Sequence, residues 1–147
     1  MTRILFVCLG NICRSPMAEA VFLERARVRG VSGHFEADSA GTGGWHAGET
    51  PDPRTIQELA RHGIPWASRA RQVVAEDFRR FDHLFAMDRD NERDLLHWPG
   101  ADPGRVSLLL GEHEVPDPYY GGPEGFRHVF ELVSAGADAI LDRLAHP

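Results

Sequence analysis

A short apolar run, Ile4 to Val7, leads directly into the segment Cys8 to Ser15, and Pro16 follows at a point where a helix can begin. Continuous apolar residues are typical of a strand that is buried on both faces, and proline favours the first turn of a helix. The segment therefore predicts a strand, a tight loop and a helix in immediate succession. Because such a strand needs cover on both sides, this feature restricts the chain to a layered α/β fold.

The rest of the chain continues this alternation. Apolar periodicity and turn residues predict strands at 3–7, 35–39, 83–87 and 106–110, and helices that start near residues 15, 53, 76, 90 and 126, with Ser15 capping the first helix. Strands that alternate with helices are joined by right-handed crossovers into a parallel sheet. We therefore expect a single-domain three-layer sandwich over residues 1–147, with a four-stranded parallel sheet flanked by helices.

The composition excludes several classes of protein. Of the 147 residues, 42% are hydrophobic and 26% are charged, and the net charge of −6 argues against general nucleic-acid binding. No apolar run approaches the length of a membrane span, and the run near the start is too short for a secretory signal. The two cysteines lie in one loop, unlike those of a disulfide-framed secreted protein. These features predict a cytoplasmic protein without nucleic-acid or membrane partners.

The segment Cys8 to Ser15 combines a nucleophile, an anion cradle and a fixed positive charge. Loop amides and the start of a helix both favour a bound anion, and Arg14 offers a planar fork that matches two phosphate oxygens. Cys8 in that field should ionise readily, and the thiolate is the reactive form of cysteine. Gly10 and Asn11 tolerate left-handed backbone geometry, and Ser15 can donate a hydrogen bond to the Cys8 sulfur. The pattern predicts phosphoryl transfer through a cysteinyl-phosphate.

Such a reaction also needs an acid on the far side of the phosphoryl group, where the leaving oxygen must be protonated. Asp117 lies between two prolines, which restrict the loop and hold the carboxyl in place. The loop follows the fourth predicted strand, so it leaves the sheet at the same edge as the loop that follows Cys8. Walls for a flat aromatic substrate could come from Tyr119, Tyr120 and Trp45.

Several short motifs occur in order along nearly the whole chain. They are the Cys8–Ser15 loop, Ser39-Ala40-Gly41-Thr42, Ala70-Arg71-Gln72, Ala86-Met87-Asp88 and Asp117-Pro118-Tyr119-Tyr120. In this order and spacing, the chain resembles the low-molecular-weight protein tyrosine phosphatases. The resemblance implies a phosphotyrosine protein phosphatase I-like fold and hydrolysis of phosphotyrosine without a metal or cofactor.

The resemblance also implies roles for individual residues. Cys8 would be the nucleophile, Arg14 the phosphate ligand and Asp117 the general acid and then the base. The remaining implied roles are a phosphate-binding loop of Leu9, Gly10, Asn11, Ile12, Cys13 and Ser15, loop support from Ser39 and Asp88, and a substrate rim of Trp45, Tyr119 and Tyr120. In the family the second loop cysteine, here Cys13, can form a disulfide with the nucleophile and protect it from irreversible oxidation.

The implied partners are phosphotyrosine-containing proteins, a tyrosine kinase among them, and the implied product is inorganic phosphate. One departure is Ser68, which stands where eukaryotic members of the family carry a histidine that supports the loop.

Three other functions compete with this interpretation. Arsenate reductases share the loop but need further cysteines toward the C-terminus, which this chain lacks. Protein-arginine phosphatases resemble the chain closely, but they tend to carry a threonine where Ile12 stands. A phosphotyrosine-binding module without turnover would not need both Cys8 and Asp117. The residues therefore favour a tyrosine phosphatase, with an arginine phosphatase as the nearest alternative.

Overall fold

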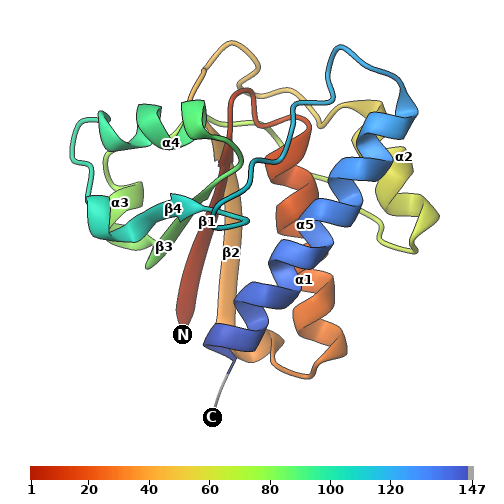
Figure 1. Ribbon diagram of the computed structural model, residues 1–147, viewed down its shortest axis with the longest axis horizontal. Helices are drawn as coiled ribbons and strands as arrows, with labels where there is room; N and C mark the ends of the chain where they lie inside the picture. Colours follow the sequence, from red (N-terminus) through yellow and green to blue (C-terminus); the bar gives the residue numbers. More distant parts are fainter. Residues whose placement is uncertain (146–147) are drawn as a thin grey trace.

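The computed structural model describes residues 1–145, and within them strands and helices alternate as the sequence predicts (Figure 1). Residues 146 and 147, the last two of the expected domain, lie outside this range. The strands are β1 (Thr2–Cys8), β2 (Phe35–Gly41), β3 (His83–Ala86) and β4 (Val106–Leu108). The α-helices are α1 (Arg14–Val28), α2 (Pro53–Arg61), α3 (Asp77–Arg80), α4 (Arg89–Leu96) and α5 (Pro123–Leu144).

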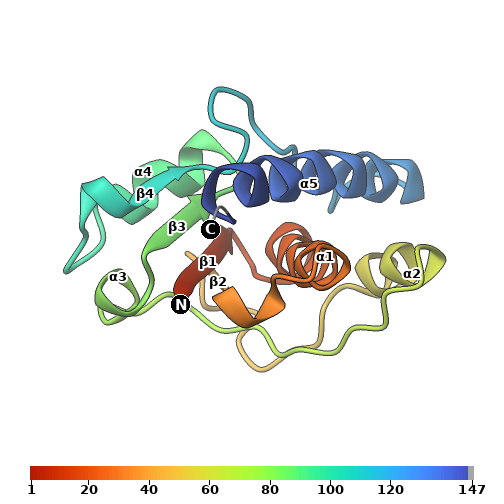
Figure 2. The same cartoon turned by 90° about the horizontal axis from the view of Figure 1, so that it is seen from below.

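The four strands form one parallel sheet in the order β2-β1-β3-β4. Helices α1, α2 and α5 cover one face of the sheet, and α3 and α4 cover the other (Figure 2). The expected three-layer α/β fold is confirmed.

Strand β1 is central, and its side chains alternate between two apolar cores. Ile4 and Phe6 belong to the core beneath α1 and α5, whereas Leu5 and Val7 belong to the core beneath α3 and α4. All four side chains are fully buried, which explains why the sequence there is continuously apolar.

Some predicted element bounds were wrong by a few residues. Strand β2 continues to Gly41, because Gly41 pairs with Cys8 on one side and with Gln72 on the other. Strand β4 ends at Leu108 rather than at residue 110, and the backbone turns at Gly111 with a φ of 78°. Helix α5 begins at Pro123, earlier than its apolar stripe indicates, since a first-turn proline needs no N–H partner.

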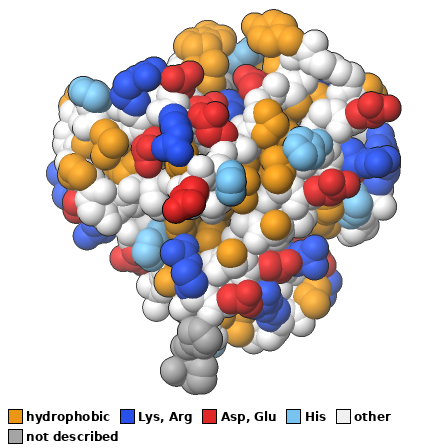
Figure 3. Space-filling view, viewed as in Figure 1, with side chains coloured by type: hydrophobic (Ala, Val, Ile, Leu, Met, Phe, Trp, Pro, Cys, Tyr) orange, Lys and Arg blue, Asp and Glu red, His pale blue; other side chains and the backbone are white. Residues whose placement is uncertain are grey.

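The carboxyl ends of the strands meet at one end of the molecule, where the connecting loops gather (Figure 1). In the space-filling view, hydrophobic side chains project from this same end (Figure 3). Ligands in open parallel sheets bind at this edge. Among residues 1–145, no helix combines the length and the apolar character that a membrane crossing requires.

Candidate active site

The loop between β1 and α1 turns its carbonyl groups outward. The carbonyls of Cys8, Leu9 and Ile12 accept hydrogen bonds from the N–H groups of residues 42, 43 and 52, and that of Cys13 accepts from the Thr55 hydroxyl. Among the loop amides of residues 9–13, only that of Asn11 donates to a protein group within the described part of the chain. The other amides remain available to an anion bound inside the loop.

Asn11 holds the loop in shape from its centre. Its φ of 58° is the only left-handed value at a non-glycine residue in positions 1–145, so of the two loop residues that tolerate this geometry, Asn11 adopts it and Gly10 does not. Its side-chain amide donates to Ser15 Oγ at 2.8 Å, and its side-chain carbonyl accepts from Arg71 N at 3.0 Å. These contacts join the loop to the segment that follows α2.

Gly41 lies directly against the loop at the end of β2. A Cβ atom at this position would lie 2.7 Å from the Leu9 carbonyl oxygen and 3.2 Å from Asn11 N. Both neighbours are backbone atoms that cannot rotate away, so only glycine allows the strand to approach this closely.

Cys8 is 2% exposed, and its sulfur lies at the bottom of the loop. Ser15 Oγ lies 3.0 Å from the sulfur, and Asn11 N donates to it at 3.3 Å. Because Ser15 Oγ accepts a hydrogen bond from Asn11, its own proton can point to the sulfur at 3.0 Å or to the Ala40 carbonyl at 3.5 Å, and the sulfur is the nearer acceptor. The prediction that Ser15 caps the helix was wrong: the cap position is Cys13, without a side-chain cap, and Ser15 faces Cys8 from inside the first turn.

Arg14 is a buried cation held by several acceptors. Its Nη1 donates to Asp88 Oδ2 at 2.7 Å and to the Val115 carbonyl at 2.9 Å, and its Nη2 lies 3.8 Å from Asp117 Oδ2. Burial acts to lower the pKa of Arg14, but the Cys8 sulfur and the Asp88 carboxylate outweigh it and raise the pKa above the usual range. Arg14 therefore remains charged beside the sulfur.

Asp88 serves two neighbours through its two carboxylate oxygens. One oxygen accepts from Arg14, and the other accepts from Asn91 N at 2.8 Å and so caps α4. Asp88 thus combines the ion-pair role and the helix-cap role, and it fixes Arg14 to the end of β3.

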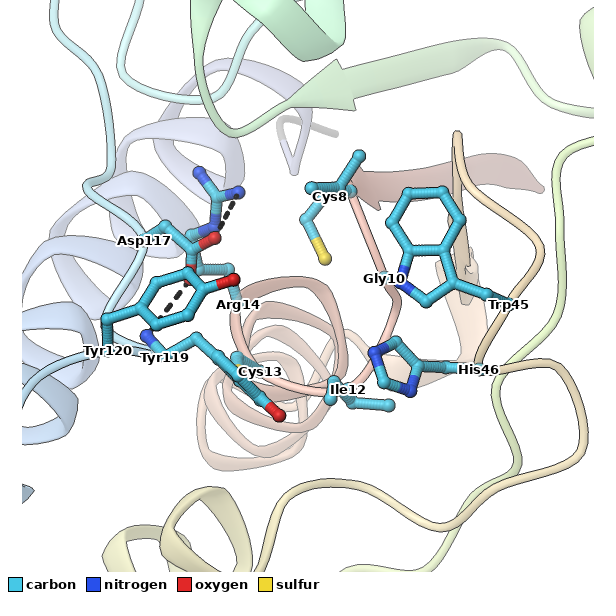
Figure 4. A pocket seen from close by; sticks show the side chains of 11 residues that line it. Cys8, Gly10, Ile12, Cys13, Arg14, Trp45, His46, Asp117, Tyr119 and Tyr120 are labelled. Carbon is cyan, nitrogen blue, oxygen red and sulfur yellow. Dashed lines mark hydrogen bonds and ion pairs between the residues drawn. The ribbon is translucent and has the colours of Figure 1, made fainter.

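Asp117 lies across the pocket from Cys8, with Arg14 between them (Figure 4). Its side chain is 39% exposed, and Oδ1 accepts a hydrogen bond from Tyr119 N at 3.1 Å. The second oxygen lies on the side of Arg14, so the carboxyl is held near the phosphate-binding loop while it remains partly exposed to solvent.

The pocket above Cys8 has a volume of about 320 Å³. Tyr119 and Tyr120 form one wall, and Trp45 forms part of the opposite wall with His46 (Figure 4). His46 was not predicted to line the site, because its position beside Gly10 depends on how the 42–50 loop folds back. Its Nδ1 lies 3.1 Å from Glu49 Oε2.

The expected direct support of the loop by Ser39 was wrong. Its hydroxyl donates to Glu19 Oε1 at 2.6 Å, because Ser39 faces α1 rather than the loop. Burial raises the pKa of the Glu19 carboxyl to about 7; the Ser39 hydrogen bond opposes this rise and the nearby Asp38 adds to it.

This carboxyl makes folding stability depend on pH. Because the pKa of Glu19 is higher in the folded protein, the protonated carboxyl contributes to the free energy of unfolding. This contribution is complete below the ordinary pKa of 4.5 and is lost as pH rises through about 7. Between pH 5 and pH 8, Glu19 should lower the free energy of unfolding of the parent by at most roughly 3 kcal/mol. Because Glu19→Gln removes the titrating group, we expect the variant to avoid this loss. Urea unfolding at both pH values measures this difference. Glu24→Gln, a change at a partly exposed carboxyl on the same helix, is the control, and an equal response of the two variants would contradict the prediction.

Cys13 is a free, buried thiol that also lines the pocket. Burial raises its pKa far above the ordinary value, and the nearby Asp52 and Cys8 add to the rise. Cys13 therefore stays protonated at neutral pH and is a poor competing nucleophile. Its redox partnership with Cys8 stays a prediction.

Two further residues were left without an assigned role by the sequence. Ser68, which stands at the position of the family's histidine, accepts a hydrogen bond from Trp66 Nε1 at 3.1 Å, and the Asn11 side chain is bound by the backbone of Arg71. Arg54, which the sequence analysis did not find, bonds to the carbonyls of Tyr119 and Gly121 in the Asp117 loop. Arginine–carbonyl contacts of this kind leave no signal in a single sequence.

Comparisons with known proteins agree on one family. The family model described as low molecular weight phosphotyrosine protein phosphatase matches residues 3–147. A relative from Streptomyces coelicolor, named low molecular weight protein-tyrosine-phosphatase, is 47% identical over 149 residues, which are 95% of this chain and 91% of the relative.

Solved structures share the fold. A protein tyrosine phosphatase from Entamoeba histolytica superposes with a TM-score of 0.93 at 37% identity, covering 99% of this chain and 97% of that one. A Drosophila arginine phosphatase superposes with a TM-score of 0.90 at 32% identity and covers 99% of each chain.

Proposed function

The chain belongs to the low molecular weight phosphotyrosine protein phosphatase family, and from this membership we propose how its own residues carry the reaction. It is a protein-tyrosine phosphatase, a hydrolase of phosphoric monoesters on proteins. The observation that most supports the mechanism below is that Cys8, Arg14 and Asp117 line one pocket from three different parts of the chain.

In the first step, the phosphate group binds to the free loop amides and to Arg14, and Cys8 attacks phosphorus from below. The S–P bond forms as the bond from phosphorus to the tyrosine oxygen breaks, and Asp117 donates a proton to that oxygen. The Ser15 hydroxyl lies 3.0 Å from the attacking sulfur, and the charged Arg14 lines the same pocket.

In the second step, a water molecule takes the place of the departed tyrosine. Asp117, now a carboxylate, accepts a proton from this water while the water oxygen attacks phosphorus. The S–P bond breaks, inorganic phosphate leaves, and the Cys8 thiolate regains its hydrogen bond from Ser15. One carboxyl thus serves as acid and then as base, which requires it to lie on the side of phosphorus opposite the sulfur.

The walls of the pocket support an aromatic substrate. Trp45, Tyr119 and Tyr120 present flat faces on opposite sides of the opening, and a phenyl ring between them would gain stacking contacts. Ile12 adds an apolar side chain to the pocket lining, and contact with it would remove hydration from a guanidinium group. Both features favour phosphotyrosine over phosphoarginine.

We expect kcat/KM for phosphotyrosine peptides to exceed that for phosphoarginine peptides of the same sequence. Release of inorganic phosphate from the paired peptides, in the presence of a chelator, measures this ratio. Phosphoserine peptides of the same sequence are the matched control, because they carry a phosphate monoester but no aromatic ring. If phosphoarginine is the much better substrate, or if turnover needs an added metal, the assignment is wrong.

The substrates are phosphoproteins, as family membership implies. We propose that a tyrosine kinase is among them and that the whole chain, residues 1–147, acts as one catalytic domain. The two free thiols are consistent with our proposal of a cytoplasmic, reducing environment.

A further inference from the structure

Arg54 connects the first turn of α2 to the loop that carries Asp117. Its Nη1 donates to the Gly121 carbonyl at 2.8 Å, and its Nη2 donates to the Tyr119 carbonyl at 2.9 Å. The guanidinium also lies over the ring of Phe126, at 4.4 Å from its centroid, near the start of α5. One cation therefore holds two carbonyls of the same short loop.

The side chain of Arg54 is itself fixed in place. Asp52, 9% exposed, pairs with it through both oxygens, at 3.0 Å to Nε and 3.0 Å to Nη2. Paired contacts of this kind set the orientation of the planar guanidinium as well as its position. The group thus presents its remaining donors to the loop in a fixed direction.

The same turn of α2 is joined to the phosphate-binding loop. Asp52 N donates to the Ile12 carbonyl at 2.8 Å, and the Thr55 hydroxyl donates to the Cys13 carbonyl at 3.2 Å. The first turn of α2 therefore contacts the loop of the nucleophile with its backbone and Thr55, and the loop of the acid with Arg54.

The Asp117 loop has few other attachments: Asp117 forms its ion pair with Arg14, at 3.8 Å, and Pro118 is buried. Within residues 1–145, Arg54 is the only side chain outside 117–122 that donates a hydrogen bond to that segment. Tyr119 and Tyr120 are exposed by 40% and 93%, so packing restrains them little. The position of Asp117 over Cys8 depends on a loop whose main external hydrogen bonds come from one residue.

We propose that Arg54 is a positioning residue: it holds the Asp117 loop where the Asp117 carboxyl can protonate the leaving oxygen. The proposal rests on the function proposed above, in which Asp117 is the general acid. A misplaced acid affects only leaving groups that need a proton. Arg54 is not among the residues that line the pocket above Cys8, so its effect on the reaction passes through Asp117.

The test measures phosphoenzyme formation by rapid quench, with an aryl phosphate whose leaving group is poor and with p-nitrophenyl phosphate, whose leaving group is good. We expect Arg54→Ala to slow the first substrate by roughly 10- to 100-fold and the second much less. Arg54→Lys should show a smaller slowing with the same dependence on leaving group. Arg27→Ala, which removes the exposed arginine that pairs with Glu24 on α1, should react like the parent.

The Arg54 substitutions are also made in the Asp117→Ala variant, to decide whether Arg54 affects phosphoenzyme formation through Asp117. There, Arg54→Ala should slow phosphoenzyme formation no further with either substrate. An equal slowing of both leaving groups, or a full additional loss in the Asp117→Ala background, would overturn the proposal. If Arg54→Ala does not fold, the Arg54→Lys measurements decide in the same way.

Failure of the proposed function would look different. In that case the parent protein itself would form no phosphoenzyme, or Asp117→Ala would react at the parent rate with the poor leaving group. The role of Arg54 fails alone if Asp117→Ala shows its leaving-group dependence and the Arg54 variants do not.

Discussion

Replacing Cys8 with serine should abolish turnover while leaving phosphate binding largely intact. A serine hydroxyl is a far weaker nucleophile, and we expect a loss of roughly 10,000-fold or more, the scale seen when other hydrolases lose a covalent nucleophile. The anion would still meet the free loop amides and Arg14, whose ion pair with Asp88 does not involve the sulfur. Phosphate release from p-nitrophenyl phosphate and rapid-quench trapping of the phosphoenzyme measure the loss.

Two controls separate a chemical effect from an unfolded loop. Thermal unfolding should show a midpoint close to that of the parent, and inorganic phosphate should raise the midpoint in both proteins. A phosphoenzyme that still forms in the Cys8→Ser variant would place the nucleophile elsewhere, and loss of the phosphate effect would show that the loop itself had changed.

The second large effect concerns the acid. We expect Asp117→Ala to slow phosphoenzyme formation from phosphotyrosine by roughly 100- to 10,000-fold, the usual range for loss of a general acid. With p-nitrophenyl phosphate the first step should change little, because that leaving group departs without a proton. Hydrolysis of the phosphoenzyme should slow with every substrate, since the same carboxyl activates the water.

Rapid-quench kinetics of phosphoenzyme formation and hydrolysis check this expectation. The rate of the same variant with p-nitrophenyl phosphate, whose leaving group is good, is the control. Nearly equal rates for the variant and the parent on phosphotyrosine would exclude the role given to Asp117. A uniform slowing of the first step across leaving groups would instead indicate that the ion pair with Arg14 matters for phosphate binding.

The sequence could predict those features that are encoded locally. The apolar run before Cys8 and the proline after Ser15 determine a strand, a loop and a helix within a few residues, and the left-handed turn falls on Asn11, one of the two loop residues that tolerate it. The meeting of Asp117 with Cys8 followed from a general rule, because loops that leave parallel strands at the same edge lie close together.

The features that were missed depend on contacts between distant segments. Ser15 has the residue type of a helix cap, but the approach of the Cys8 sulfur gives its hydroxyl a different partner. Ser39 bonds to Glu19 because β2 places it against α1, and Arg54 reaches the Asp117 loop across 65 residues. Such pairings follow from the packing of the layers, which local patterns do not specify.

The depth of the pocket has a consequence for selectivity. The sulfur of Cys8 is almost completely buried, while the aromatic residues that surround the opening stand well out from the surface. A phosphoryl group must therefore pass this rim before it can touch the sulfur. Phosphorylated serine and threonine hold the phosphate closer to the backbone than phosphotyrosine does, so we expect the rim to disfavour them.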